Sequence, residues 1–494
     1  MIKKSEKFYI TTSIAYTNAP PHIGFALELV QADVLARYHR ILGDDVFFLT
    51  GTDEHGTKIA RKAEELGKKP EEFTDEISQE FEKLTKELNI SNNDFIRTTD
   101  KKRHWPTVEK AWKELKKNKD IYEKEYKGLY CIGCEAFVKE KDLTDGKCPN
   151  HLKEPEIIEE KNWFFKLSKY ANQVKEEIEK DEIKIIPETR KNEILSFINQ
   201  GIEDVSISRS RESLKWGIPV PGDPNQTIYI WFEALLNYLF PKDYWPADVQ
   251  CIGKDIFRFH ALFWPAMLIA LKLERPKNIL VHGFVTANGQ KMSKSLGNVV
   301  DPFELIEKHG ADTVRYFLMR EIASTQDGDF THEKFKERYN ADLANGVGNL
   351  ISRVLTLIEK RFNGKIPESS KIKPDSLIKK INNYNKLLVD LKIDEALKEI
   401  MLICSDLDNR IDKEQIYKAD STILSDALYE FSETIRIWAW LILPFLPETS
   451  DKTFEQLGLD IKKEKSKKFE EAIKWGGLKP GTKIKKGKPL FPRI

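Results

Sequence analysis

Apolar runs alternate with helically spaced segments in the first part of the chain. Residues 7–12 and 45–49 have the pattern of buried strands, and residues 23–42 repeat apolar positions at helical spacing. Strands that alternate with helices are typical of a parallel, doubly wound (Rossmann-type) α/β sheet, which binds ligands at the carboxyl ends of its strands. The polar turns 17–21 and 51–56 follow these two strands. We therefore expect functional groups on both turns.

The pattern changes twice further along the chain. Residues 121–211 contain short, charged stretches and three of the five cysteines, which indicates an insertion. Strand-like runs return at 250–253 and 278–281, and beyond about residue 340 only helical periodicity remains, which predicts a C-terminal helical bundle. The clearest helical segments there are 350–361, 377–391 and 423–441. The expected division is a catalytic sheet at 1–120 and 212–285, an insertion at 121–211, a loop region at 286–340 and a helical domain at 341–494.

Composition excludes several classes of protein without naming a function. The 494 residues are 40% hydrophobic and 32% charged, which is typical of a soluble globular chain. No apolar run reaches the ~18–20 residues of a membrane span, and the start has no secretion signal, so we expect a cytoplasmic protein. An odd number of cysteines agrees with a reducing compartment. The net charge of +1 means that an acidic partner would have to bind local basic patches, such as the lysine-rich segment 483–493.

The tripeptide His22-Ile23-Gly24 lies between the first strand and the following helix. Backbone N–H groups and the helix dipole at such a position favour an anion. His22 could donate a hydrogen bond to a phosphate, and Gly24 would let a flat base lie close to the backbone. Taken alone, the tripeptide fits a turn histidine equally well.

Two lysines, Lys291 and Lys294, lie three residues apart and beside serines, after the flexible turn 286–289. Lysine is a mobile point charge that can neutralise a phosphate in a transition state. An isolated pair of this kind is usually a solvated basic loop. Its occurrence in one chain with His22-Ile23-Gly24, in this order, favours a site that acts on a nucleotide phosphate.

Cys131 and Cys134 form one pair with two intervening residues, and Cys148 and His151 form another. Three thiolates and one imidazole suit a closed, tetrahedral, structural zinc ion. The alternative is a set of free cysteines in a reduced loop. The spacing favours zinc, which would shape the insertion rather than take part in chemistry.

The segments 22–24 and 291–295 together resemble the paired signatures of the class I aminoacyl-tRNA synthetases. The chain as a whole is similar to the methionyl-tRNA synthetases of the single-zinc form. Further segments that carry the resemblance are 48–56, 216–221, 282–285, 327–330 and 349–353. The resemblance implies an enzyme that activates L-methionine with ATP and Mg²⁺ and transfers it to tRNA(Met). Phe25 departs from the family pattern, which has a second histidine or an asparagine there, so His22 and the lysines, or water and a backbone N–H, must supply the missing contact.

Methionine needs a carboxylate for its ammonium group and an apolar, aromatic wall for its thioether. Asp53, at the tip of the second strand, could bind the ammonium group or cap a helix. Trp231, Ala234, Leu235 and Tyr238 share one helical face, which by spacing alone indicates core packing. The resemblance implies instead that they line the methionine pocket, with Ser13, Ile14, Tyr16, Ile256 and His260. It also implies that Gly253 and Asp255 lie near the ribose of ATP.

The resemblance has consequences for the rest of the chain. The insertion is too short for an editing domain, which favours methionine over leucine, isoleucine or valine as the substrate. Asn349 and Arg353 share one helical face and are implied to contact the anticodon, with Trp475 as a base-stacking partner. The chain ends without a dimerising domain, so a monomer is expected. Alternatives left open are a class I synthetase of other specificity, a nucleotidyltransferase of the same fold and an inactive tRNA-binding relative.

Overall fold

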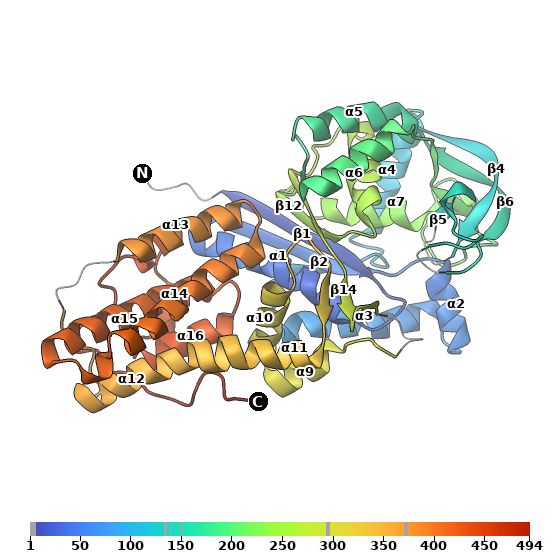
Figure 1. Ribbon diagram of the computed structural model, residues 1–494. Helices are drawn as coiled ribbons and strands as arrows, with labels where there is room; N and C mark the ends of the chain where they lie inside the picture. The colour runs from blue at the N-terminus through green and yellow to red at the C-terminus, as the bar shows by residue number, and fades with distance from the viewer. Residues whose placement is uncertain (1–5, 133–135, 139, 150–151, 293–296, 370–373) are drawn as a thin grey trace.

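A six-stranded parallel sheet forms the centre of the molecule, with the strand order β3-β2-β1-β12-β13-β7 (Figure 1). The computed structural model describes residues 6–132, 136–138, 140–149, 152–292, 297–369 and 374–494. The strands of this sheet are β1 (Lys7–Tyr16), β2 (Asp45–Asp53), β3 (Asp94–Arg97), β7 (Lys184–Ile186), β12 (Val249–Gly253) and β13 (Asn278–His282). All neighbouring pairs run parallel, which confirms the predicted doubly wound sheet.

Helices cover both faces of the sheet because alternate strand residues are apolar on both sides. Ile10, Val249 and Leu280 pack with α1 in one hydrophobic core. Ile252 and Ile279 pack with α8 in another. The helices of this part are α1 (Ile23–Leu42), α2 (Thr57–Glu65), α3 (Pro70–Glu87), α4 (Trp105–Lys117), α5 (Leu167–Glu179), α6 (Glu188–Asn199), α7 (Ile230–Leu235), α8 (Trp264–Ala270), α9 (Pro302–His309), α10 (Ala311–Glu321) and α11 (His332–Arg338).

The insertion forms an antiparallel sheet in the order β5-β4-β6-β8, at the end of the molecule remote from the helical bundle (Figure 1). Its strands are β4 (Ile121–Cys131), β5 (Ala136–Val138), β6 (Glu156–Phe165) and β8 (Val205–Ser206). Within the expected insertion 121–211, however, β7 pairs with β13 at the edge of the central sheet. The expected insertion therefore does not form one separate layer, because its second half returns to the catalytic sheet.

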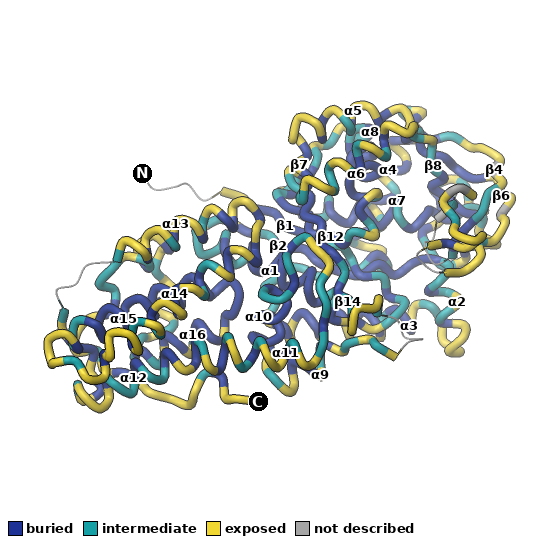
Figure 2. Tube along the Cα trace, in the orientation of Figure 1, coloured by how far each residue is buried: buried dark blue, intermediate teal, exposed yellow. Residues whose placement is uncertain are grey.

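The C-terminal part is a helical bundle whose core is continuous with the catalytic part (Figure 2). Its main helices are α12 (Asn349–Arg361), α13 (Asp375–Val389), α14 (Ile393–Lys413), α15 (Ser421–Ile442) and α16 (Pro447–Gln456), which confirm the three periodic segments. The fully buried Arg315 on α10 pairs with Asp33 of α1 at 2.8 Å and donates to the carbonyls of Pro444 and Phe445. This guanidinium group joins the two parts.

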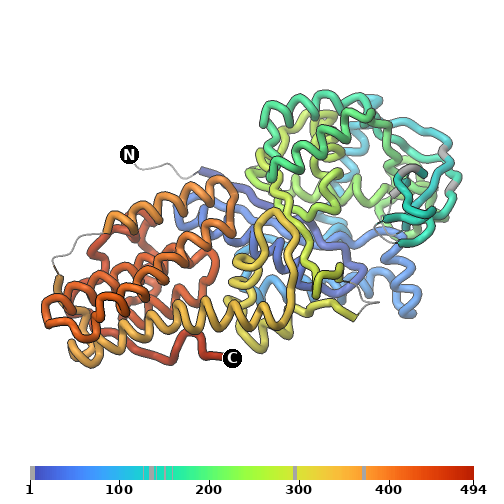
Figure 3. The backbone as a smooth tube through the Cα atoms, viewed as in Figure 1, coloured from blue at the N-terminus to red at the C-terminus, as the bar shows by residue number. Residues whose placement is uncertain are grey.

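The C-terminal tail returns along the bundle to the segment between α11 and α12 (Figure 3). The hydroxyl of Tyr339 donates to the carbonyl of Pro492 at 2.7 Å, and the Asn340 amide donates to the carbonyl of Ile494 at 2.9 Å. None of the helices in the described part of the chain combines the length and the apolar character that a membrane span needs.

Candidate active site

The carboxyl ends of four central strands meet at one edge of the sheet. Tyr16, at the end of β1, pairs in register with Asp53, at the end of β2. On the other side of β1, Gly253 of β12 pairs with His282 of β13. Asp53 is only 5% exposed, although it is the last residue of its strand. The predicted ammonium ligand therefore lies at the same sheet edge as the predicted ribose site.

His22 caps helix α1 with its own side chain. Its Nδ1 accepts the N–H of Gly24 at 3.0 Å, and the N–H of Ile23 donates to the carbonyl of Val300 at 3.2 Å. The expectation that these N–H groups face an anion is therefore wrong for this conformation, because the chain already supplies their acceptors. A Cβ at Gly24 would lie 2.8 Å from Cε1 of His22. A side chain at this position would therefore displace the capping ring.

The same hydrogen bond determines what the His22 ring can do. Because Nδ1 is an acceptor, the proton of the neutral ring is on Nε2. Desolvation by the surrounding protein lowers the pKa of His22, and the Asp255 carboxylate partly opposes that shift. A Cβ on Gly253 would lie 2.8 Å from Oδ1 of Asp255. Neutral His22 therefore offers an Nε2–H donor, with Asp255 and Gly253 close by.

The segment that carries Lys291 is a hairpin of β14 (Val285–Ala287) and β15 (Gln290–Lys291). The expected flexible turn is instead a tight two-residue Asn-Gly turn, because Asn288 (φ 54°) and Gly289 (φ 74°) both take the left-handed conformation. The side chain of Met292 reaches within 3.8 Å of a Cβ built on Gly24. The hairpin end thus faces the start of α1. Lys294 lies outside the described residues.

Asp327 fixes the base of this hairpin. Its carboxylate accepts the N–H of Phe284 at 2.8 Å and both its oxygens lie 2.7 Å from Nζ of Lys254. The Phe284 ring has Lys254 Nζ 4.3 Å from its centroid and Lys291 Nζ 5.2 Å from it. The strand β16 (Gly328–Phe330) pairs with β14 alongside. Lys291 is therefore held over an aromatic ring on a rigid base, a contact that the sequence did not reveal.

Aromatic side chains from two segments form the predicted methionine wall. The ring of Trp231 stacks on Phe259 with centroids 4.0 Å apart, and the Tyr238 hydroxyl lies 2.8 Å from Nε2 of His260. Nδ1 of His260 lies 3.1 Å from the carbonyl of Ile256. The expectation of one continuous helical face is wrong, because α7 ends at Leu235 and Tyr238 lies on a 3-10 turn, Leu236–Leu239. Both Ala234 and Leu235 are buried.

Burial lowers the pKa of His260 to about 4, more than its hydrogen bond to Ile256 and the charge of Glu28 raise it. At neutral pH the ring is therefore uncharged: Nδ1–H donates to the carbonyl of Ile256, and Nε2 accepts from Tyr238. A neutral ring keeps this wall compatible with an uncharged thioether.

This shift predicts a pH effect on stability. The unfolded chain protonates His260 near its usual pKa of 6.5, but the folded chain does so only near 4. Its contribution is thus complete above pH 6.5 and is lost as the pH falls from there towards 4, by about 3 kcal/mol at one pKa unit per 1.4 kcal/mol. Free energies of unfolding at pH 7 and pH 4 for the wild type and His260→Gln measure it. The wild type should lose more than the variant; equal losses would contradict the assignment.

Two further polar residues of the site were not predicted from the sequence. Glu28, buried on α1, accepts the N–H and the hydroxyl of Ser13, both at 2.6 Å, and its other oxygen lies 2.8 Å from Nε2 of His282. Burial lowers the pKa of His282, but the Glu28 carboxylate raises it further, so the net shift is upward. The sequence feature that could have revealed Glu28 is a glutamate on the apolar, buried face of α1. The predicted pocket residues Ser13, Ile14 and Tyr16 are half-buried.

Comparisons with known proteins agree with this geometry. The family described as tRNA synthetases class I (M) matches residues 8–156 and 141–355. A methionine–tRNA ligase of Thermotoga maritima is 40% identical, over 99% of this chain and 80% of the relative. The chain belongs to the methionyl-tRNA synthetase family. A methionine–tRNA ligase of Clostridium tetani is 44% identical, over 99% of this chain and 78% of the relative. The Mycobacterium tuberculosis methionyl-tRNA synthetase, solved in complex with methionyl-adenylate, superposes with a TM-score of 0.92, 37% identity and coverage of 99% and 100%.

The insertion of this member of the methionyl-tRNA synthetase family contains two turns that begin at cysteines. Cys131 ends β4 and pairs with Ala136 across a short reversal. The Cys148 carbonyl accepts the N–H of Leu152 at 2.7 Å, so a second tight turn follows Cys148. Both cysteines are buried, at 3% and 1% exposure. Two buried cysteines at such turns fit half of the predicted ligand set of a structural zinc, whereas Cys134 and His151 lie outside the described residues.

In the synthetase's helical part, the three predicted anticodon residues lie in different settings. Asn349 is exposed at the start of α12. The Arg353 guanidinium lies 2.8 Å from Asp408 and 2.5 Å from Asp412 of α14. Trp475 packs against the hydrophobic core, its ring centroid 6.3 Å from that of Tyr429. Arg353 would therefore have to exchange an acidic partner for a base.

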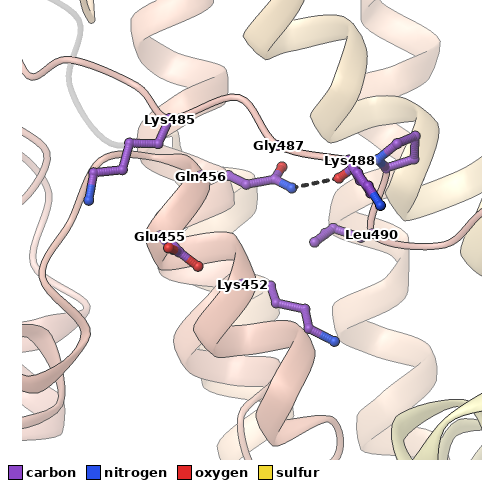
Figure 4. Close-up of a pocket in the computed structure, with 8 residues that line it drawn as sticks. Lys452, Glu455, Gln456, Lys485, Gly487, Lys488 and Leu490 are labelled. Carbon is purple, nitrogen blue, oxygen red and sulfur yellow. Dashed lines mark hydrogen bonds between the residues drawn. The ribbon is translucent and has the colours of Figure 1, made fainter.

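A cavity of about 330 Å³ between α16 and the C-terminal tail does not belong to the active site (Figure 4). Lys452, Lys485 and Lys488 line it, but the side chain of Lys485 points to the opposite side from those of Lys452 and Lys488. The amide of Gln456 donates to the carbonyl of Lys488 at 3.0 Å and so closes one wall. Because the ammonium groups do not converge, this cavity lacks the geometry of an anion site.

Proposed function

We propose that this chain activates L-methionine with ATP to methionyl-adenylate and transfers the methionyl group to the terminal ribose of tRNA(Met). One observation supports the proposal most directly: the buried carboxylate of Asp53 lies at the carboxyl edge of the sheet, next to the end of β1, which leads to His22. The end of the hairpin that carries Lys291 faces the same start of α1. The aromatic wall of Trp231 and Tyr238 supplies the apolar side that a thioether needs.

In the first step, a carboxylate oxygen of methionine attacks the α-phosphorus of ATP, and the bond to pyrophosphate breaks. Asp53 binds the ammonium group, so the carboxylate points at the nucleotide. The Nε2–H of His22 donates to a phosphate oxygen, and Lys291 and Lys294 neutralise the growing charge on the leaving pyrophosphate. Asp255 receives the ribose, and Mg²⁺ enters with ATP on its phosphates. No protein nucleophile is required.

In the second step, a ribose hydroxyl of the tRNA attacks the carbonyl carbon of the adenylate, and AMP leaves. We assign Asn349 and Arg353 of α12 to the anticodon, with Trp475 as the stacking partner. The fold supports a division of labour in which the central sheet performs the chemistry and the bundle holds the tRNA. We place the enzyme in the cytoplasm with its tRNA, and a monomer stays a prediction.

Amino-acid-dependent ATP–pyrophosphate exchange tests the proposal. The wild type should exchange with methionine and not with leucine, isoleucine, valine or cysteine. Exchange driven by leucine or cysteine alone would mean a class I synthetase of other specificity. Exchange with none of them, beside intact tRNA binding, would favour the inactive relative, and adenylation of a small cofactor would favour the nucleotidyltransferase.

We also propose that Cys131, Cys134, Cys148 and His151 hold one structural zinc ion. Replacing Cys148 with serine should lower the zinc content from about one ion per chain to near zero, because three ligands bind the ion far more weakly than four. Elemental analysis of the purified variant measures this. Cys404→Ser, at a buried position of α14, is the matched control and should keep its zinc. Full zinc content in Cys148→Ser would contradict the ligand set.

A further inference from the structure

Glu233 lies fully buried between three elements of the catalytic part, two residues after Trp231 on α7. Its Oε1 lies 2.7 Å from Nδ1 of His55, and its Oε2 lies 2.9 Å from Nε2 of His104. Each histidine is only 2% exposed. A carboxylate taken out of water needs such partners on both oxygens, because a buried charge is costly unless it is hydrogen-bonded.

The two histidines belong to the elements against which α7 must be placed. His55 lies two residues after Asp53, on the turn that follows β2, and His104 directly precedes α4. The helix α7 has only six residues, so its own backbone hydrogen bonds hold its orientation weakly. Two separate contacts from one planar carboxylate fix both the position and the rotation of α7. The turn that bears Asp53 and the helix that bears Trp231 are thus tied by a single side chain.

We propose that Glu233 is a positioning residue for the methionine site. Through His55 and His104, it keeps the wall that carries Trp231 and Ala234 at a fixed distance from Asp53. This inference rests on the proposed function, because it assumes that methionine lies between that wall and Asp53. The nucleotide groups lie on other segments, at the start of α1 and on the turn 253–255. Loss of the tie should therefore weaken methionine binding and leave ATP binding unchanged.

The variant Glu233→Gln keeps the volume of the side chain but replaces one acceptor oxygen with an NH₂ group. One histidine must then either face a donor or move its proton to the other ring nitrogen, and both histidines lose a charged acceptor, so α7 is tied more weakly on both sides. We expect the KM for methionine in ATP–pyrophosphate exchange to rise by about 10- to 100-fold, the range that a displacement near 1 Å can produce. The KM for ATP should stay within about twofold of the wild type, a much smaller change than the tenfold difference that corresponds to 1.4 kcal/mol.

A matched control separates positioning from general destabilisation. Glu177 of α5 is also buried, with Arg275 at 2.7 and 2.9 Å, but it lies outside the methionine wall. Glu177→Gln should leave both KM values unchanged. A loss of folded enzyme lowers the apparent kcat but not KM. If Glu233→Gln lowers only kcat, the positioning role is overturned.

The histidine side provides a second, independent measurement. In His104→Gln, the amide places an N–H close to the position of Nε2. The KM for methionine should therefore stay within about threefold of the wild type, a change below 1 kcal/mol. His104→Leu removes the donor and should raise that KM as Glu233→Gln does. Equal KM values in the two variants would overturn the inference. If the wild type shows no methionine-dependent exchange, the proposed function itself is contradicted. If the wild type exchanges normally and Glu233→Gln has a normal KM for methionine, only this inference is overturned.

Discussion

Replacing Lys291 with alanine is expected to lower the kcat of methionine-dependent ATP–pyrophosphate exchange by about 10²–10³-fold. Negative charge grows on the leaving pyrophosphate in the transition state, and a preorganised cation stabilises that charge more than it stabilises the ground state. The Lys291 ammonium lies over the ring of Phe284, and no ion pair is found for it within the described part of the chain. It is therefore available to a phosphate without first leaving a carboxylate.

We expect Phe25 at the start of α1 to make this effect larger. The family usually carries a second imidazole or an amide there, whereas the Phe25 ring packs edge-on against Phe81 of α3, with centroids 5.0 Å apart. An apolar side chain cannot donate to a phosphate, so fewer groups share the charge. We expect His22, Lys291 and Lys294, or water and a backbone N–H, to supply the missing contact.

Two variants make the test specific. Lys308→Ala on α9 removes an exposed lysine that lies 3.5 Å from Glu304, and its exchange rate should equal that of the wild type. Lys291→Arg keeps a positive charge and should retain more activity than Lys291→Ala. If Lys291→Ala keeps an exchange rate within about threefold of the wild type, the decrease is far smaller than the loss of a transition-state contact would cause. This lysine then does not stabilise the leaving group.

Replacing Glu433 with alanine is expected to lower the free energy of unfolding by about 3–5 kcal/mol, the range for breaking a buried ion pair. Glu433 and Arg436 on α15 are both fully buried, with Arg436 Nη2 2.7 Å from Oε1 of Glu433. The same carboxylate accepts the N–H groups of Gly476, Gly477 and Leu478 at 2.8–2.9 Å. Alanine would leave a buried guanidinium group short of a partner and three N–H groups without acceptors.

Urea denaturation of the wild type and the variant measures this loss. Glu470→Ala removes an exposed glutamate of α18 (Phe469–Ala472), so it changes the net charge equally and should alter stability by less than about 0.5 kcal/mol. The prediction is contradicted if Glu433→Ala unfolds within 1 kcal/mol of the wild type, a loss no larger than that of an exposed ion pair. Because the carboxylate holds the segment that begins at Trp475, the variant should also weaken tRNA binding if Trp475 contacts the tRNA.

Secondary structure was largely predictable because its signals are local. The periodicity over 23–42 predicted α1 with its observed bounds, and the apolar runs located β1, β2, β12 and β13. The errors have one common cause, which is contact between residues far apart in the sequence. The segment around Tyr238 repeats apolar residues at helical spacing, yet tertiary packing ends α7 at Leu235 and continues as a 3-10 turn. Likewise, β7 is only three residues long, and its pairing with β13 depends on residues about ninety positions away.

The sequence by itself determined the alternation of strands and helices. It also placed His22 before the first helix, Asp53 at a strand end and Lys291 after a turn, because backbone periodicity and turn chemistry depend on neighbouring residues. Family resemblance added the identity of the wall residues. Only the tertiary structure decided which groups face one another: Glu28 with Ser13 and His282, and the Phe284 ring beneath Lys291. These contacts join residues far apart in the chain, and their distances follow from how the layers pack. Burial, which keeps His260 uncharged at neutral pH, depends on that packing as well.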